Sequence, residues 1–381
     1  MGHSTMVRKM TIVFGIVMAV AMLATVVLPL FGQGVGHSLT RTTTGDVSNN
    51  DGHNPAVIPT FPPPDTNFDN ISFDNRYFHP TGLFTIAQPE GWQALSPTIR
   101  PDEVQVSLSN SQNLSVLQAS VTKPDNPVTT AADLDAFFSE DLLNTSWATY
   151  NSWEETGRNI LDDRIVIDFS VQTRGQNFIA RQVSWVDEAG VIDSVRVITP
   201  ENAAPLLQFL AETVPPTLET NDFFLASPFE WRSYADDAAS HVIRYPNSWT
   251  VTDSAPGRPA SISGDDVALR VESEADVAIS DPDAAAGWVT SLRGGVNVLS
   301  VEPVTRGGVD GFSVAYSFTD VDGEPFSGLA VLLNGPDDQL HVADLRFPGG
   351  DVNLNEVDGD SEYSDLANVM ETFTILPEAA E

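Results

Sequence analysis

The hydrophobic and polar positions of the chain predict one series of strands that occurs twice. In the first part, alternation of apolar and polar residues predicts half-buried strands at Val104–Leu108, Leu114–Val121, Ile165–Val171, Ala180–Val186 and Val191–Ile198. In the second part, the corresponding strands are Val267–Glu272, Phe312–Phe318 and Leu340–Phe347. The turns predicted between paired strands are Asp187–Gly190, Asp320–Glu324 and Asn334–Asp338. The pattern therefore predicts two copies of one antiparallel unit.

Apolar residues at helical spacing predict one inserted helix in each copy. In the first copy, Thr130–Asp133 resembles a capping box that opens the helix. In the second copy, Asp281 is the predicted N-cap and Pro282 the first-turn residue. The residues predicted to face the core are Leu134, Phe137, Phe138 and Leu142 in the first copy and Trp288 and Leu292 in the second.

Each copy also has a recognisable beginning and end. Phe84–Trp92 and His241–Trp249 both read as a short strand followed by Pro-x-x-Trp. Because proline fixes the exit turn and tryptophan is a large apolar anchor, we expect Trp92 and Trp249 to be buried at equivalent places. The closing helices are predicted from Leu206, Phe209, Leu210 and Thr213 in the first copy, and from Leu366, Val369, Met370 and Phe373 in the second.

This order of elements predicts an α+β fold, with two tandem domains that each hold an antiparallel sheet flanked by helices. Strict alternation of strand and helix, which a doubly wound parallel sheet needs, is missing. Changes of composition give the domain plan: a cytoplasmic N-terminus at 1–10, a transmembrane anchor at 11–32, a flexible Pro/Gly/Asn-rich tether at 33–76, the first domain at 77–218, a linker at 219–233, the second domain at 234–377 and a tail at 378–381.

The anchor is predicted from Thr11–Gly32, an uncharged and mostly apolar run long enough to cross a bilayer of ~30 Å. Arg8 and Lys9 precede it, which favours a cytoplasmic N-terminus and places the domains outside the cytoplasm. The alternative is a cleaved signal peptide, which would make the protein secreted. Its apolar region is normally shorter, ~7–15 residues, and no convincing Ala-x-Ala cleavage site follows.

Charge and cysteine content exclude several classes of function. The chain has 18 Lys and Arg residues against 53 Asp and Glu, a net charge of −35, and Lys9 and Lys123 are its two lysines. Such a field repels phosphate backbones, so no nucleic-acid partner is expected. The absence of cysteine excludes disulfides, thiolate metal sites and cysteine nucleophiles. His79 and His241 are interpreted as local hydrogen-bonding residues.

The strand motif Phe-Thr-Ile-x-x-Pro-x-x-Trp, the antiparallel strands with one inserted helix, and the closing helix ending at Phe373–Leu376 resemble the PsbP-like family. This resemblance implies a central antiparallel sheet with helices on both faces and a non-catalytic accessory or binding role. It implies no active-site residues. The family usually has one such domain, and the histidine and carboxylate sites proposed for its photosystem members have no clear counterpart here.

Motifs that carry chemistry are scarce. Gly311–Ala315 lacks the second glycine of a nucleophile elbow and lies in a predicted strand, and there is no P-loop. Asp358, Asp360 and Glu362 alternate in a predicted loop and are the candidate calcium ligands, although the spacing does not fit an EF-hand. No other cofactor is expected.

These observations favour a membrane-anchored, extracytoplasmic, non-enzymatic accessory or binding protein with an unidentified protein partner, held in the membrane by its N-terminal helix. Two alternatives remain open: a secreted or anchored carboxylate-dependent hydrolase, and a calcium-responsive adhesion or assembly protein. A cleft lined by converging carboxylates, one of them with a raised pKa, would favour the hydrolase. The sequence leaves the partner, the biological process and the oligomeric state open.

Overall fold

The computed structural model describes residue 68 and residues 70–376 apart from 237, 239 and 265. The predicted anchor at 11–32, most of the tether and the tail lie outside the described residues. Among the residues that the structure describes, no helix is long and apolar enough to cross a membrane.

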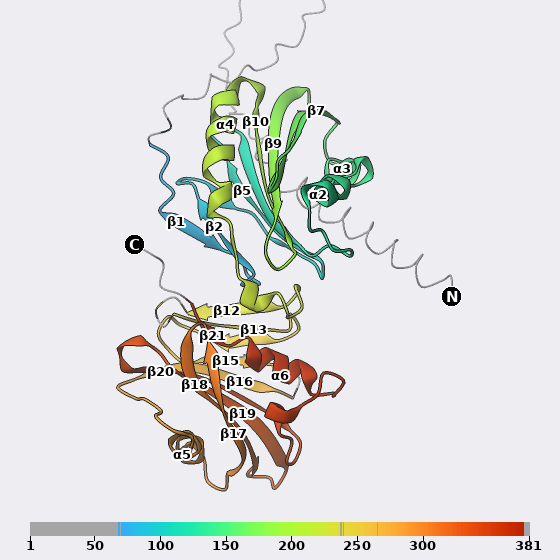
Figure 1. Ribbon diagram of the computed structural model, residues 1–381. Helices are drawn as coiled ribbons and strands as arrows, with labels where there is room; N and C mark the ends of the chain where they lie inside the picture. The colour runs from blue at the N-terminus through green and yellow to red at the C-terminus, as the bar shows by residue number, and fades with distance from the viewer. Residues whose placement is uncertain (1–67, 69, 237, 239, 265, 377–381) are drawn as a thin grey trace, which may run out of the picture. The chain divides into compact units, whose positions relative to one another are not determined.

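The chain forms two compact units. The first comprises the described residues up to Tyr77 together with 86–98 and 105–218, and the second comprises 78–85, 99–104 and everything described from Glu219 onward. Each unit is mostly antiparallel sheet with few helices, coloured blue to green in the first and yellow to red in the second (Figure 1).

The first unit is built on an eight-stranded sheet of order β3-β5-β6-β10-β9-β8-β7, with β4 paired to β5. Its strands are β3 (Gln93–Ala94), β4 (Thr98–Ile99), β5 (Glu103–Asn110), β6 (Ser115–Thr122), β7 (Ser152–Ile160), β8 (Arg164–Thr173), β9 (Gln176–Val186) and β10 (Ile192–Pro200). A small sheet, β1-β2-β11, consists of β1 (Asn75–Phe78), β2 (Phe84–Gln88) and β11 (Glu219–Thr220). The five predicted strands of the first copy correspond to β5, β6, β8, β9 and β10.

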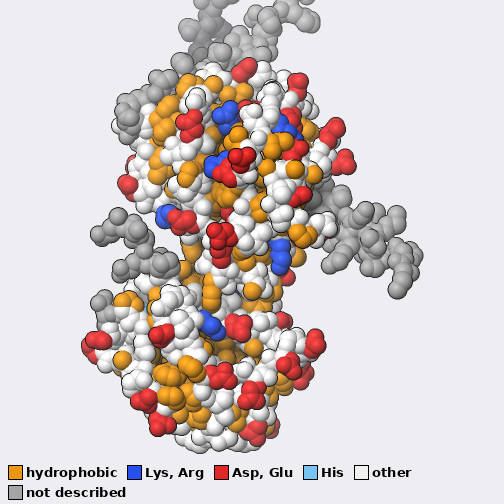
Figure 2. Space-filling model, in the orientation of Figure 1, with side chains coloured by type: hydrophobic (Ala, Val, Ile, Leu, Met, Phe, Trp, Pro, Cys, Tyr) orange, Lys and Arg blue, Asp and Glu red, His pale blue; other side chains and the backbone are white. Residues whose placement is uncertain are grey.

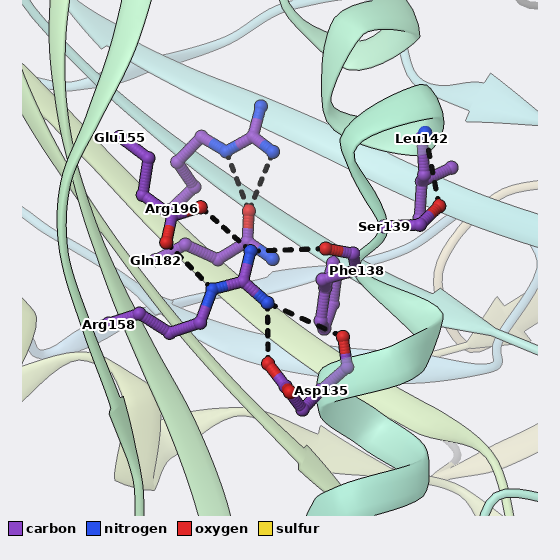
Figure 3. Close-up of polar contacts among 8 residues, drawn as sticks. All are labelled: Asp135, Phe138, Ser139, Leu142, Glu155, Arg158, Gln182 and Arg196. Carbon is purple, nitrogen blue, oxygen red and sulfur yellow. Dashed lines mark hydrogen bonds and ion pairs between the residues drawn. The ribbon is translucent and has the colours of Figure 1, made fainter.

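The inserted segment of the first unit is two short helices, where the sequence predicts one. They are α2 (Ala131–Phe137) and α3 (Glu140–Ser146). The Thr130 capping box is confirmed, but Phe138 leaves the helical conformation at φ −80° and ψ 55°. Ser139 then caps α3 by accepting a hydrogen bond from the Leu142 amide, as Figure 3 shows. A serine favours this capping position over a helix interior, which the apolar spacing alone does not reveal.

The closing helix of the first unit is α4 (Ala204–Thr213), which follows η1 (Glu201–Ala203) and precedes η2 (Pro215–Thr217). It packs against β9 and β10. Figure 1 shows α4 and the α2–α3 pair on different sides of this sheet. The ring of Phe209 on α4 stacks on Phe68 with centroids 4.9 Å apart, so apolar residues of the predicted tether pack against this helix.

The second unit repeats the strand order. Its seven-stranded sheet runs β14-β15-β16-β20-β19-β18-β17, and its small sheet runs β12-β13-β21. The strands are β12 (Arg232–Asp236), β13 (His241–Tyr245), β14 (Thr250–Asp253), β15 (Ala260–Ser263), β16 (Ala268–Ala275), β17 (Asn297–Arg306), β18 (Val309–Thr319), β19 (Pro325–Asn334), β20 (Gln339–Pro348) and β21 (Thr374–Ile375). The helical segments are η3 (Asp222–Phe224), α5 (Pro282–Leu292), η4 (Pro336–Asp338), η5 (Leu354–Glu356) and α6 (Ser364–Glu371).

The two faces of the second sheet have separate cores. Along β19, Val331 and Leu333 belong to the core that contains Val369 of α6. Ala330 and Leu332 belong to the core that contains Val289 of α5. Successive side chains of a strand point to opposite faces, so one strand contributes to both cores. The second unit therefore has helices on both faces of its sheet.

The cap of α5 is confirmed, and so is the packing of Trp288 against the core, whereas the predicted burial of Leu292 is wrong. Asp281 accepts a hydrogen bond from the Ala284 amide at 2.9 Å, and Pro282 opens the helix. The buried residues are Ala285 and Val289; Trp288 is half-buried and Leu292 is 39% exposed. The smaller residues Ala285 and Val289 face the sheet more directly than Trp288 and Leu292 do, because a small side chain permits a closer approach of helix and strands.

The two Pro-x-x-Trp motifs form the same turn. The Trp92 amide donates to the Pro89 carbonyl at 3.1 Å, and the Trp249 amide donates to the Pro246 carbonyl at 3.0 Å. Trp92 is buried, but Trp249 is only half-buried against the core of the second unit. The shared turn is thus confirmed, and both tryptophans pack at the start of their units, Trp249 less deeply than Trp92.

Candidate anion-binding pocket

Strand register relates one position on the first sheet to one on the second. Ile165–Val171 and Phe312–Phe318 are corresponding strands, so Ile167 corresponds to Val314. From Ile167 the antiparallel pairs lead to Gln182 and then to Arg196. From Val314 they lead to Ala330 and then to Asp344. Arg196 on β10 and Asp344 on β20 therefore occupy equivalent places.

In the first unit this place is covered. The Arg196 guanidinium lies 4.3 Å from the centre of the Trp147 ring and donates to Gln182 Oε1 at 2.9 and 2.6 Å and to Ser146 Oγ at 3.1 Å. The Arg196–Gln182 pair is drawn in Figure 3. Trp147 is 0% exposed. Since α3 and Trp147 follow directly on α2, the second inserted helix is the element that closes this face.

In the second unit the inserted segment is α5 alone, and the equivalent place is open. A pocket of about 600 Å³ lies there, within the second unit. Its lining residues are Arg270, Glu272, Leu292, Arg293, Gly294, Phe318, Thr319, Asp320, Val321, Asp344 and Arg346. Three arginines thus line one pocket of a chain in which acidic residues far outnumber basic ones. Figure 2 shows acidic side chains spread widely over the visible face.

Asp344 lies at the base of this pocket and is 4% exposed. The Tyr316 hydroxyl donates a hydrogen bond to its Oδ1. Its Oδ2 faces Arg293 Nη2 and Arg346 Nε, each at 3.6 Å, which is an ion-pair distance and too long for a hydrogen bond. Two guanidinium groups therefore form ion pairs with the same carboxylate oxygen, and neither is close enough to donate a hydrogen bond to it.

The side-chain donors of Arg293 and Arg346 are unused within the described part of the chain, where neither guanidinium makes a hydrogen bond and Arg346 Nε is buried without one. Arg158 in the first unit is the contrast: it donates to Glu155 at 2.8 and 2.7 Å, to Asp135 at 2.6 Å and to the Phe138 carbonyl at 3.1 Å (Figure 3). An arginine has five N–H donors, and buried donors are normally satisfied. The pocket therefore offers hydrogen-bond donors to an anion.

Packing around the pocket positions Arg293 and Tyr316. Arg293 follows the last residue of α5, and its guanidinium lies 4.3 Å from the centre of the Phe318 ring. Gly328 on β19 makes room for the Tyr316 ring, because a Cβ there would come within 2.4 Å of the Tyr316 ring carbon Cζ. The tyrosine can thus lie across β19 and reach Asp344.

Burial governs the ionisation of this buried pair. Desolvation raises the pKa of Asp344 above its usual value, while the Tyr316 hydrogen bond and the charges of Arg346 and Arg293 oppose the shift. Desolvation, followed by the charge of Asp344, also raises the pKa of Tyr316. Glu272, by contrast, is bound by Arg270 at 2.5 Å. Burial therefore favours the protonated form of the Asp344 carboxyl.

The candidate calcium ligands lie elsewhere. Asp358, Asp360 and Glu362 are all exposed, between η5 and α6. Within the described residues there is no group of three or more His, Cys, Asp or Glu placed to hold a metal ion. The calcium site stays a prediction.

The sequence pattern places most of the pocket residues in strands, a turn and, for Leu292, a buried helix face, but it does not predict that they form a site. The available signal was the pair of opposite charges, Asp344 and Arg346, within the mostly apolar strand Leu340–Phe347. A charged residue in such a run is rarely buried unless it is paired.

Two histidines of the second unit share one hydroxyl. Ser273 Oγ lies 3.2 Å from His241 Nδ1 and 2.8 Å from His341 Nδ1. The interpretation of His241 as a hydrogen-bonding residue is thereby confirmed. Desolvation, then the charge of His341, lowers the pKa of His241 to about 4 against the opposing charge of Asp236, and burial lowers the pKa of His341.

This pair predicts a loss of stability in acid. The histidines take up protons more readily in the unfolded chain, at a pKa near ~6.5, than in the folded protein. The contribution of His241 is therefore complete above pH ~6.5 and is lost as the pH falls toward about 4, by about 1.4 kcal/mol per pH unit. The lowered pKa of His341 acts in the same direction. Urea unfolding from pH 7 to 4 should show a shallower decline in His241→Gln than in the unmodified protein. Equal declines would contradict this assignment.

Comparison with known proteins gives structural neighbours at low identity. No family model and no curated protein matches the chain. Neighbouring solved structures include the cyanobacterial PsbP protein CyanoP of Synechocystis sp. PCC 6803, at 18% identity and a TM-score of 0.31, with 38% of this chain and 92% of that protein covered. The Ran-binding protein Mog1p of Saccharomyces cerevisiae is 13% identical with a TM-score of 0.28, covering 38% and 95%.

A third neighbour spans more of the chain. The T6SS immunity protein TplEi of Pseudomonas aeruginosa, in complex with a peptide, is 11% identical with a TM-score of 0.22, covering 76% of this chain and 99% of that protein. The neighbours thus include PsbP-like proteins and proteins solved with or named for a protein or peptide partner. These identities and TM-scores do not assign the chain to a family.

Proposed function

We propose that the protein is a membrane-anchored, extracytoplasmic, non-enzymatic accessory or binding protein with two PsbP-like domains, and that its second domain binds an anionic group of a ligand or partner. The observation that carries this proposal is the pair of arginines, Arg293 and Arg346, whose donors face the pocket and share one oxygen of Asp344 at 3.6 Å. Hydrogen bonds from arginine to a carboxylate or phosphate are charge-assisted and therefore strong.

The anchor and the location rest on the Thr11–Gly32 run and its basic flank. They support a role at a membrane or envelope complex, with the two domains carried on the tether. Alkaline extraction of isolated membranes, followed by N-terminal sequencing, tests this part of the proposal. Recovery of a soluble chain that begins after the apolar run would establish the secreted alternative.

A carboxylate-dependent hydrolase is the second candidate, and Asp344 is the observation that favours it. A buried carboxyl with a raised pKa is suited to general-acid work. Its neighbour Glu272 forms an ion pair with Arg270 at 2.5 Å, which makes it a poor base or nucleophile. Hydrolysis that is abolished by Asp344→Asn would support this candidate over binding alone.

The binding proposal predicts that neutralising the two arginines removes anion binding. Each charge-assisted hydrogen bond contributes about 1.5–3 kcal/mol, so the double variant Arg293→Met/Arg346→Met is expected to bind at least 100-fold more weakly. Calorimetric titration with acetate, benzoate and inorganic phosphate measures the effect. The control for lost positive charge is the double variant Arg258→Met/Arg232→Met, which removes two exposed arginines outside the pocket.

Thermal melting of each variant shows whether the second domain remains folded. Binding of none of the three probes by the unmodified protein would refute the anion site. An equal loss in the control variant would show that long-range charge, and not the pocket, is responsible.

A further inference from the structure

We propose that the pocket takes up a singly charged carboxylate together with one proton, which Asp344 accepts. This inference rests on the proposed anion site and names its ligand class and its control by pH. Asp344 then acts as a counter-ion that occupies the two arginines until an external carboxylate replaces it.

The groups around Asp344 make it the exchangeable member of the pocket. Tyr316 of β18 donates to one carboxylate oxygen, and Arg293 beyond α5 and Arg346 of β20 face the other. From β16, Arg270 and Glu272 face the pocket as an ion pair, and Asp320 faces it from the turn after β18. Next to Asp344, β19 contributes only Ala330, which has no charge.

Asp320 is held in its turn and does not compete for this role. Its Oδ1 accepts hydrogen bonds from the Asp322 amide at 2.9 Å and from the Glu324 amide at 2.8 Å. Glu272 is likewise engaged by Arg270. The arginine partners of Asp344 lie beyond hydrogen-bonding distance. Separating Asp344 from these arginines therefore breaks no hydrogen bond and costs less free energy than releasing Glu272 or Asp320.

The charges of the lining residues favour a monoanion. Three arginines, Arg270, Arg293 and Arg346, face three carboxylates, Glu272, Asp320 and Asp344, so the empty pocket is neutral. A bound carboxylate adds one negative charge, and a proton on Asp344 restores neutrality. A phosphate dianion would leave an excess negative charge in a partly buried space, where uncompensated charge is costly.

Protonation also rearranges the hydrogen bonds in favour of the ligand. Tyr316 can keep its bond to Oδ1, while a proton on Oδ2 turns that oxygen from an acceptor into a donor. Both guanidinium groups are then free to bind the incoming carboxylate. Leu292, 39% exposed, and the ring of Phe318 give the pocket an apolar wall that suits a carboxylate with an apolar body.

The number of protons taken up on binding tests this inference. Titration of the full chain with benzoate at one pH, in two buffers of different ionisation enthalpy, should show uptake of one proton per benzoate bound. Above the pKa of Asp344 in the free protein, the benzoate affinity should fall tenfold per pH unit. In Asp344→Asn, the affinity should be independent of pH while benzoate remains ionised, and proton uptake should vanish.

Failure of this inference can be told apart from failure of the proposed function. Benzoate binding without proton uptake would overturn the role of Asp344 and leave the anion site standing. Tighter binding of inorganic phosphate than of benzoate would overturn the ligand class. Binding of neither probe at any pH would refute the anion site itself. If Asp344→Asn does not fold, the proton count on the unmodified protein decides.

Discussion

Replacement of Arg244 by methionine is expected to lower the free energy of unfolding of the second domain by about 3–5 kcal/mol. Arg244 is 0% exposed. Its Nη1 donates to the Phe224 carbonyl at 2.9 Å and to Ser227 Oγ, and its Nη2 donates to the Pro228 carbonyl at 2.7 Å. Two further carbonyls, those of Phe229 and Trp231, accept from Nη2 at 3.3 Å. Methionine fills the space but leaves these acceptors buried without donors, at about 1–3 kcal/mol each before water enters.

Two matched variants separate the hydrogen bonds of Arg244 from its charge. Arg244→Lys keeps the charge but has three donors in place of five, so its loss of stability should lie between zero and that of Arg244→Met. Arg232→Met removes an exposed arginine of β12 and should change stability by less than ~0.5 kcal/mol. Calorimetric unfolding measures all three. A loss below ~1 kcal/mol in Arg244→Met would show that the segment from Phe224 to Trp231 is held by its apolar residues.

Arg244 also shows what the sequence pattern could and could not predict. The repeat of Pro-x-x-Trp aligns the opening strands, and in this alignment Arg244 corresponds to Ala87 of the first copy. The predicted linker 219–233 was interpreted as a connection between domains, yet Phe224, Phe229 and Trp231 are buried and Arg244 binds the backbone between them. A side chain that binds carbonyls of an irregular segment has no periodic signature, because carbonyls are present at every residue.

Strand positions were predictable because alternation is a local property. Phe312–Phe318 lies within β18, and Leu340–Phe347 lies within β20. The pocket was not predictable, because it depends on register across the sheet. Arg270 and Asp344 become neighbours only when β16 pairs with β20. Arg293 joins them only because α5 ends beside them, and a pattern along the chain does not contain that geometry.

The difference between the inserted segments of the two domains was also beyond the sequence pattern. Phe137, Phe138 and Leu142 have helical spacing, so one continuous helix was expected. Ser139 divides that segment, and the second piece carries Trp147 over the sheet. The second domain lacks such a piece, so the equivalent part of its sheet is the floor of the pocket. Closure of this face in one domain and its opening in the other follow from the presence or absence of one short helix, α3.

Trp147→Ala is therefore expected to destabilise the first domain by about 3–5 kcal/mol, the usual cost of deleting a fully buried tryptophan. The Trp147 ring packs 5.0 Å from Phe169 and 5.2 Å from Tyr150, measured between ring centres, and it covers the Arg196 guanidinium. Its loss removes apolar burial and leaves a cavity above the same sheet position that the second domain leaves open. Calorimetric unfolding should show a lower midpoint for the first domain.

Trp153→Ala is the matched control. Trp153 is half-buried on β7, and its ring lies 6.0 Å from the same Phe169, so its removal deletes an equal volume with less buried surface. We expect the control to lose less than half as much stability as Trp147→Ala, since the cost follows buried area and residual cavity. Trp147→Phe should recover part of the loss by refilling the site beside Phe169. Equal losses in Trp147→Ala and Trp153→Ala would contradict the role of Trp147 as the residue that closes this face, because its full burial over Arg196 would then contribute no additional stability.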